Sequence, residues 1–262
     1  DNDSLVLHAP HPTLSAAENF LYMLRPDHKY TKLEAEVLDL CMIVHAEHGG
    51  GNNSAFTTHV VSSSGTDTYS AIGAAICSLK GPKHGGAATT VAAMFKEIKE
   101  SVKDWESDDE VDAYITKIIH KEAFDRSGLV YGMGHAVYTL SDPRAVLLKE
   151  KARELAESKG REKEFALYDK VEHITPQVFN RERGTDKVMT ANVDFYSGFV
   201  YDMLGLPEDL FTPLFAMSRI VGWCAHRMEE LVSGGKIIRP AYKSIAHKSK
   251  YVPLEERENA AK

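Results

Sequence analysis

Apolar residues recur at helical spacing along most of this chain. Between residues 33 and 44, apolar side chains stand at positions 33, 37, 40, 41 and 44, and three glycines follow at 49–51. A return every three or four residues is the period of one face of an α-helix. The same spacing predicts further helices after Ser15 and after Asp67, and over residues 87–102, 109–123, 143–158, 161–180, 194–204 and 207–231.

Polar residues mark where several of these helices begin. Ser15 and Thr31 are each followed three positions later by a glutamate, Glu18 and Glu34 respectively. In such a capping box the hydroxyl accepts a hydrogen bond from an early backbone amide, and the glutamate reaches back to the cap residue. Asp67 is placed to cap the next apolar run, which ends at a Gly-Pro pair at 81–82.

Strand signals are scarce, so the sequence predicts a mainly α fold. Only residues 128–131 and 236–238 carry short runs typical of extended structure. The dense succession of helical patterns therefore outweighs the usual mixture of helix and strand in a globular protein.

Composition and charge narrow the class of protein. With 262 residues, 43% of them hydrophobic and 26% charged, the chain can bury a substantial core in one large or two smaller domains. A net charge of -7 argues against nucleic-acid binding, which needs a clustered excess of Lys and Arg. The basic run at 243–250 is short and interrupted, and no segment reaches the apolar length of a membrane span. Neither a nucleic acid nor a membrane is expected as a partner.

The three cysteines indicate a reducing compartment. Cys41, Cys77 and Cys224 are odd in number, widely spaced and embedded in apolar helical patterns. This arrangement suits reduced core thiols rather than a disulfide framework or a zinc site. We expect a cytoplasmic protein, or one of the mitochondrial matrix if the source is eukaryotic.

Three glycine-flanked stretches each present one titratable side chain: His84, His135 and Asp194. Two imidazoles and a carboxylate provide a base for a weakly acidic carbon and donors for two developing oxyanions. Glycine beside each lets the backbone turn sharply and lets a ligand come close. Each residue alone also has an ordinary structural interpretation, namely a hydrogen-bonded loop histidine or, for Asp194, a helix N-cap.

At these residues the chain resembles the citrate synthase family. The resemblance covers residues 40–242 and rests on an ordered set of motifs: His45-Ala46-Glu47-His48 with Asn52-Asn53-Ser54, then Gly81-Pro82-Lys83-His84-Gly85-Gly86, Gly134-His135 with Asp142-Pro143-Arg144, Asn192-Val193-Asp194, Ser218-Arg219 and Arg239-Pro240. Any single motif would be weak, whereas the ordered set is specific.

The resemblance implies a two-domain helical architecture. Family members have a large helical domain with a smaller helical domain inserted in it, and the active site lies in the cleft between them. Mapped onto this chain, residues 1–86 and 206–262 belong to the large domain and 87–205 to the small one. The family also implies a homodimer with a helical interface.

The resemblance also assigns roles. Asp194 removes a proton from the thioester methyl group, His84 donates to the thioester carbonyl oxygen, and His135 donates to the ketone oxygen of oxaloacetate. Oxaloacetate itself is implied to be bound by His48, Arg144, Arg219 and Arg239, with Arg239 reaching into the neighbouring subunit's site. His45 supports the motif structurally.

Coenzyme A is the implied acyl carrier, and it would meet a backbone-rich loop made of Leu129, Val130, Tyr131, Gly132, Met133 and Gly134. The chain contains no phosphate-binding or dinucleotide fingerprint, so we expect a coenzyme A thioester as co-substrate and no tightly bound cofactor. The His45-Ala46-Glu47-His48 run lacks the histidine spacing of helical zinc proteases, and no metal is expected. Departures from the family pattern fall at Lys83, Ala88 and Thr139.

The expected reaction joins acetyl-coenzyme A to oxaloacetate and hydrolyses the citryl thioester. Two alternatives stay open: a 2-methylcitrate synthase that uses propionyl-coenzyme A, and a helical binding module without turnover. Because the chain opens at Asp1 without a methionine, we expect a C-terminal portion of a longer protein. We expect such a portion to have little or no catalytic activity and to self-associate through the small-residue helix at 69–79.

Overall fold

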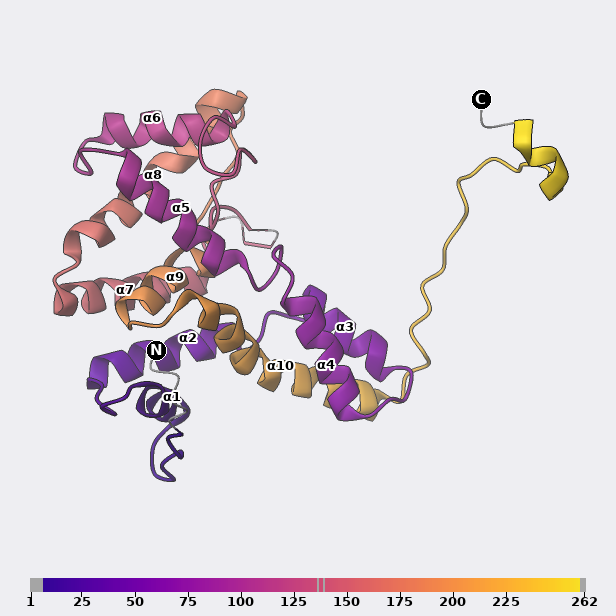
Figure 1. Cartoon of the computed structure of the whole chain (residues 1–262), viewed down its shortest axis with the longest axis horizontal. Coiled ribbons are helices and arrows are strands. Elements are labelled where there is room, and N and C mark those ends of the chain that lie inside the picture. The colour runs from indigo at the N-terminus through magenta and orange to yellow at the C-terminus, as the bar shows by residue number, and fades with distance from the viewer. Residues whose placement is uncertain (1–6, 136, 139, 260–262) are drawn as a thin grey trace.

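The computed structural model describes residues 7–135, 137–138 and 140–259, so the departure at Thr139 lies outside the described residues. The described part folds into α-helices and two short 3-10 helices, η1 (Glu208–Leu210) and η2 (Leu254–Asn259) (Figure 1). The α-helices are α1 (Ala16–Leu24), α2 (Lys32–His45), α3 (Asn53–Ser62), α4 (Thr68–Leu79), α5 (Ala87–Ser101), α6 (Asp108–Ile119), α7 (Pro143–Lys159), α8 (Glu162–Arg183), α9 (Val193–Met203) and α10 (Phe211–Ser233). The predicted mainly α fold is confirmed.

The predicted helix caps are present. Ser15 and Thr31 each form a complete capping box at the start of α1 and α2. Asp67 accepts a hydrogen bond from the backbone of Ser70 at the start of α4. Local polar residues therefore set these helix starts, because each satisfies an amide that the helix itself leaves unpaired.

Two apolar cores hold the described part together. The larger core gathers side chains from α1, α2 and α5–α9, whereas the smaller one joins α3, α4 and α10 through Ala55, Ala75, Leu79, Phe215 and Trp223. Helix α10 begins in the larger core with its first turn and then continues along α3 and α4 (Figure 1). It therefore links the two groups of helices.

Helix α2 packs against α7 and α9, which places residues 17–44 in one core with residues 88–206. This core describes which side chains pack together in the described part of the chain and does not by itself fix domain limits. The domain limits 1–86, 87–205 and 206–262 stay a prediction.

Several sequence expectations were wrong. Helix α3 was missed, because its buried face consists of Ser54, Ala55, Thr58 and Ser62 and carries almost no large apolar side chain. The extended pieces expected at 128–131 and 236–238 are loops, and the described residues contain a single isolated bridge, between Met133 and Ala191.

The burial of the three cysteines also differs from the expectation that all are core thiols. Cys41 is buried in the larger core, but Cys224 is only partly buried and Cys77 is exposed. The buried positions of α4 are Ala71, Ala75 and Leu79, which lie one turn apart, and position 77 falls on the other side of that helix. An apolar helical context thus did not suffice to place a thiol in the core.

Candidate active site

The side chains of His48, His135 and Arg144 come from separate segments and lie close together. His48 follows the end of α2, His135 lies in the loop before α7, and Arg144 stands in the first turn of α7. Nε2 of His48 lies 3.1 Å from Nε2 of His135, and Nη2 of Arg144 lies 3.5 Å from the same His135 nitrogen. Three of the predicted site residues therefore share one small region.

The orientation of His135 follows from its own backbone. Its Nδ1 accepts hydrogen bonds from the amides of Val137 and Tyr138, at 2.9 and 3.1 Å. A neutral imidazole with an accepting Nδ1 carries its proton on Nε2, which is the nitrogen that faces the site. Burial lowers the pKa of His135, and the charge of Arg144 lowers it further, so the ring is a neutral donor at pH 7.

His48 is also neutral at pH 7, because its pKa is lowered as well. Burial, followed by the charges of Arg144, His135 and Arg219, lowers the pKa of His48 to about 4. Both rings of this pair are therefore uncharged, and the positive charge of the region resides on the arginines.

Arg144 is fixed by a buried carboxylate. Asp142 is 0% exposed, caps α7, and binds the Arg144 side chain at both oxygens, with Nε–Oδ1 and Nη2–Oδ2 distances of 3.0 and 2.8 Å. The guanidinium carbon also lies 5.6 Å from the centre of the Tyr138 ring. A bidentate pair of this kind fixes the plane of the guanidinium as well as its position.

Arg219 lies buried in α10, with 2% of its surface exposed. Its Nε donates to the carbonyl oxygen of His45, and its guanidinium stacks on the Phe215 ring at 4.8 Å. Its Nη1 has no hydrogen-bond partner among the described residues. A buried guanidinium with a free donor suits an anionic ligand, because leaving such a donor unpaired is costly.

His45 is a structural residue. It is 1% exposed and its Nδ1 donates to the carbonyl oxygen of Cys41 at 2.7 Å. Burial and the charge of Arg219 lower its pKa to about 4, so it stays neutral beside the arginine.

His84 stands in the turn between α4 and α5, where a hydrogen-bond group holds its ring. Its Nε2 lies 2.9 Å from Oγ of Ser54, and that oxygen accepts from the indole of Trp223 at 3.0 Å and lies 2.9 Å from Oδ1 of Asn52. Because an indole N–H can only donate, Ser54 keeps its own proton for Asn52 or for His84. Burial and the charge of Arg219 lower the pKa of His84.

Asp194 is the second residue of α9. The helix is capped by Asn192, whose side chain accepts from the Asp194 amide, so the interpretation of Asp194 as an N-cap was wrong. Burial raises the pKa of the Asp194 carboxyl to about 6, against the opposing charges of Arg144 and Arg219. No hydrogen bond reaches this carboxylate from the described part of the chain, and a partly buried, unpaired carboxylate is a suitable proton acceptor.

The loop at 129–134 is joined to the start of α9. The amide of Gly134 donates to Thr190, the amide of Asn192 donates to Gly132, and the Asn192 side chain donates to the Gly134 carbonyl oxygen, at 2.7, 2.8 and 3.0 Å. Gly132 has a φ of +80°, and a Cβ there would lie 2.9 Å from the Phe195 Cα. The loop predicted to meet coenzyme A and the helix that carries Asp194 thus form one unit.

Arg239 lies apart from these residues. It is exposed in the extended segment that follows α10 (Figure 1). Gly234, in a left-handed conformation, caps the C-terminal end of that helix. Its expected role in a neighbouring subunit's site stays a prediction.

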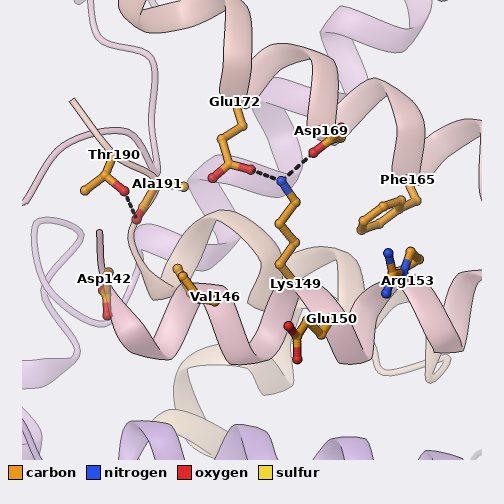
Figure 2. A pocket seen from close by; sticks show the side chains of 11 residues that line it. Asp142, Val146, Lys149, Glu150, Arg153, Phe165, Asp169, Glu172, Thr190 and Ala191 are labelled. Atoms are coloured by element: carbon orange, nitrogen blue, oxygen red, sulfur yellow. Dashed lines mark hydrogen bonds and ion pairs between the residues drawn. The ribbon is translucent and has the colours of Figure 1, made fainter. Parts of the chain in front are cut away.

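A cavity of about 510 Å³ lies between α7 and α8 (Figure 2), and neither His48 nor His135 is among its lining residues. Lys149 projects into it and pairs with Asp169 and with Glu172, the latter at 2.7 Å. Glu172 also accepts from the Tyr196 hydroxyl at 2.6 Å. Lys149, Asp169, Glu172 and Tyr196 therefore satisfy one another, and of the residues that form the site only Asp142 reaches the cavity wall.

Ser54, Asp142 and Trp223 support the site but were not named as site residues from the sequence. Ser54 and Asp142 fall inside the quoted motifs, so their positions beside Asn52 and Arg144 were the available signal. Trp223 had no such signal, since its contact with Ser54 joins residues 169 positions apart.

Comparison with known proteins gives a consistent result. The family described as citrate synthase, C-terminal domain, matches residues 2–241. A citrate synthase of Acidithiobacillus ferridurans is 40% identical over 254 residues, covering 95% of this chain and 60% of that protein.

Solved structures agree. The citrate synthase of Thermotoga maritima has a TM-score of 0.76 at 34% identity and is matched over 97% of this chain and 64% of its own. A ternary complex of the Thermoplasma acidophilum enzyme with carboxymethyl coenzyme A and oxaloacetate has a TM-score of 0.75 at 32% identity, over 95% and 61% of the two chains. This chain thus spans about three fifths of the length of these proteins.

Proposed function

Because the chain belongs to the citrate synthase family, we propose that it condenses acetyl-coenzyme A with oxaloacetate and hydrolyses the citryl thioester. One observation carries this proposal: two neutral histidines, His48 and His135, lie in contact with each other and with Arg144. The charge of Arg144 also acts on Asp194 and on Arg219. An anionic ketone substrate needs the cations and the donors, and a thioester methyl needs the carboxylate.

Asp194 is the proposed base. A thioester methyl is a very weak acid, so its base works best when partly removed from water and when the enolate oxygen receives a hydrogen bond at once. Burial raises the pKa of Asp194 to about 6, which keeps it ionised at pH 7 but more basic than an ordinary aspartate. It takes one proton from the methyl carbon.

His84 is the proposed donor to the thioester oxygen. When Ser54 gives its proton to Nε2 of His84, the ring carries its own proton on Nδ1, from which it can donate to the enolate oxygen. The lowered pKa of His84 makes it a neutral donor that stabilises the enolate without protonating the carbon.

Oxaloacetate is proposed to bind where the arginines converge. Arg144 and the free Nη1 of Arg219 suit its two carboxylates, and His48 and His135 suit its ketone and neighbouring oxygens. As the nucleophilic carbon forms a bond to the ketone carbon, the ketone oxygen becomes an alkoxide that takes the proton on Nε2 of His135, and the proton removed by Asp194 restores the neutral ring. Water then adds to the thioester carbonyl, and coenzyme A leaves as the free thiol.

The loop at 129–134 is the proposed contact for the coenzyme, with no other cofactor tightly bound. The Thermoplasma acidophilum relative binds a coenzyme A derivative together with oxaloacetate, which supports this choice of substrates. The named relatives are citrate synthases, so the 2-methylcitrate alternative is not favoured. A homodimer and a cytoplasmic location complete the proposal. No helix in the described part of the chain has the length and apolar character to cross a membrane.

The proposal is tested by following thiol release from acetyl- and propionyl-coenzyme A in the presence of oxaloacetate. Faster release with the acetyl thioester is expected, and release should depend on both substrates. Calorimetric titration with oxaloacetate alone tests the binding half separately. Binding without thiol release would favour the helical module without turnover, and the absence of both would contradict the proposal.

A further inference from the structure

A second pair of histidines lies outside the proposed active site. His59 of α3 and His226 of α10 face each other with 3.0 Å between Nε2 of His59 and Nδ1 of His226. Both are largely buried, with side-chain exposures of 17% and 12%. Nothing in the condensation uses either ring.

Carboxylates hold the outer nitrogens of both rings. Nδ1 of His59 lies 2.9 Å from Oε2 of Glu230, and Nε2 of His226 lies 2.9 Å from Glu47. An ionised carboxylate only accepts, so each neutral ring gives its single N–H to its carboxylate. The two nitrogens that face each other are then both bare acceptors, and a positive charge between them, either a metal ion or a proton added to one ring, would satisfy both.

A third ligand stands beside the pair. Oε2 of Glu229 lies 3.7 Å from Nδ1 of His226, and the three ligand atoms of His59, His226 and Glu229 all lie within 4.8 Å of one another. We propose that these three residues bind a divalent transition-metal ion, with Zn²⁺ as the best fit.

The geometry and the supporting contacts match such a site. Zinc binds imidazole nitrogens at about 2.0–2.1 Å, so two tetrahedral nitrogen ligands lie about 3.3 Å apart. The two nitrogens lie 3.0 Å apart and Oε2 of Glu229 lies 3.7 Å from Nδ1 of His226, both near that value, while the third pair of ligand atoms lies within 4.8 Å. A metal-binding histidine also usually gives its other N–H to a carboxylate, as both of these do. Two histidines and one glutamate leave a fourth position for water.

A comparable cluster elsewhere lacks these properties. Asp169, Glu172 and His173 also lie within ligand distance of one another, but the ammonium of Lys149 already pairs with both carboxylates (Figure 2). This cluster therefore has its cation built in and serves as a matched control.

The site would also touch the active site indirectly. Glu47, which supports His226, accepts from the backbone amides of His48 and Gly49. A metal that holds His226 would therefore also hold the turn that presents His48.

The test is a metal titration of the chelator-treated protein. Equilibrium dialysis against Zn²⁺, with Mg²⁺ as the hard-cation control, should give one bound Zn²⁺ per chain and no bound Mg²⁺. His59→Gln should weaken zinc binding by at least about 100-fold and Glu229→Gln by about tenfold, whereas His173→Gln should leave it within about twofold.

Co²⁺ gives an independent readout, because a tetrahedral site produces strong visible absorption bands that His59→Gln should remove. Glu229 is 71% exposed, so its substitution tests the site without disturbing the core. The proposal is overturned if the unmodified protein binds less than about a tenth of an equivalent of Zn²⁺ at micromolar concentration. It is equally overturned if Glu229→Gln and a folded His59→Gln both bind zinc as the unmodified protein does.

Discussion

The two histidine pairs have nearly the same geometry and opposite surroundings. Ring centres are 4.9 Å apart in both, and the interplanar angles are 68° for His48 with His135 and 65° for His59 with His226. Around the first pair stand Arg144 and Arg219, and around the second stand glutamates. The difference shows that neighbouring charge, more than ring contact, decides which ligand a histidine pair suits: an anion in the first case and a cation in the second.

The largest expected effect comes from Asp194, a carboxylate without a hydrogen-bond partner in the described part of the chain that lies in the charge of Arg144 and Arg219. Asp194→Asn should slow condensation by on the order of 10²-fold or more, because an amide cannot accept the methyl proton. Oxaloacetate affinity should change little, and zinc uptake at the second pair should not change. Thiol release and calorimetric titration check the first two results. Near-normal turnover in Asp194→Asn would remove this residue from the mechanism.

Removal of a cation from the first pair should come next. Arg144→Leu should weaken oxaloacetate binding on the order of 10²-fold, because a substrate carboxylate loses its paired charge. It also leaves the buried Asp142 carboxylate without its charged partner, which costs about 3–5 kcal/mol of stability. Arg153→Leu is the matched control, since Arg153 is exposed on the same helix and lines the cavity of Figure 2.

Calorimetry on both variants, with urea titration for stability, provides the measurement. A milder loss of oxaloacetate affinity is expected for His48→Ala. Equal affinity in Arg144→Leu, His48→Ala and the control would show that oxaloacetate binds elsewhere.

Two glycines test whether the coenzyme loop and the base move together. Gly132 and Gly134 both have positive φ, at +80° and +89°, but only at Gly132 would a Cβ meet Phe195. Alanine at either position costs about 1–2 kcal/mol for the backbone, and at Gly132 about 1–3 kcal/mol more for the clash. We expect Gly132→Ala to lower both stability and turnover more than Gly134→Ala does. Identical urea midpoints for the two variants would argue against the close contact with α9.

The smallest expected effect is a slope of stability with pH. His45 and His48 have folded pKa values of about 4, below their ordinary 6.5, so the folded state binds fewer protons than the unfolded state between these values. The free energy of unfolding should therefore fall as pH falls from 6.5 to 4. Asp194, raised from 3.8 to about 6, acts with the opposite sign over its own window. His84 and His135, whose pKa values are also lowered, act in the same direction as His45 and His48, so the net slope should keep the sign of the histidines.

Urea titrations at several pH values measure this slope. Asp194→Asn should steepen it, because the opposing group is gone, and His48→Gln should flatten it. A stability that rises on acidification through this window would contradict the neutral state of the first pair.

Local sequence determined much of the fold. The hydroxyl and glutamate of each capping box lie within three residues of one another, so Ser15 and Thr31 could be assigned as caps without tertiary information. The glycine-flanked motifs likewise indicated His84, His135 and Asp194, and family motifs indicated His48, Arg144 and Arg219. The structure brings His48, His135 and Arg144 together, and the charges of Arg144 and Arg219 act on Asp194, while Arg219 also lowers the pKa of His84.

Tertiary structure decided what periodicity could not. Helix α3 escaped notice because small polar residues form its buried face, which only the neighbouring α4 and α10 make favourable to bury. The approach of His59 to His226 joins residues 167 positions apart, and the carboxylates behind them come from α10 and from the turn after α2. The sequence by itself determined which side chains could accept or donate a proton. The charge around each of them, and with it the ligand each pair suits, was decided by packing, because electrostatic interactions depend on distance in space and on burial rather than on order along the chain.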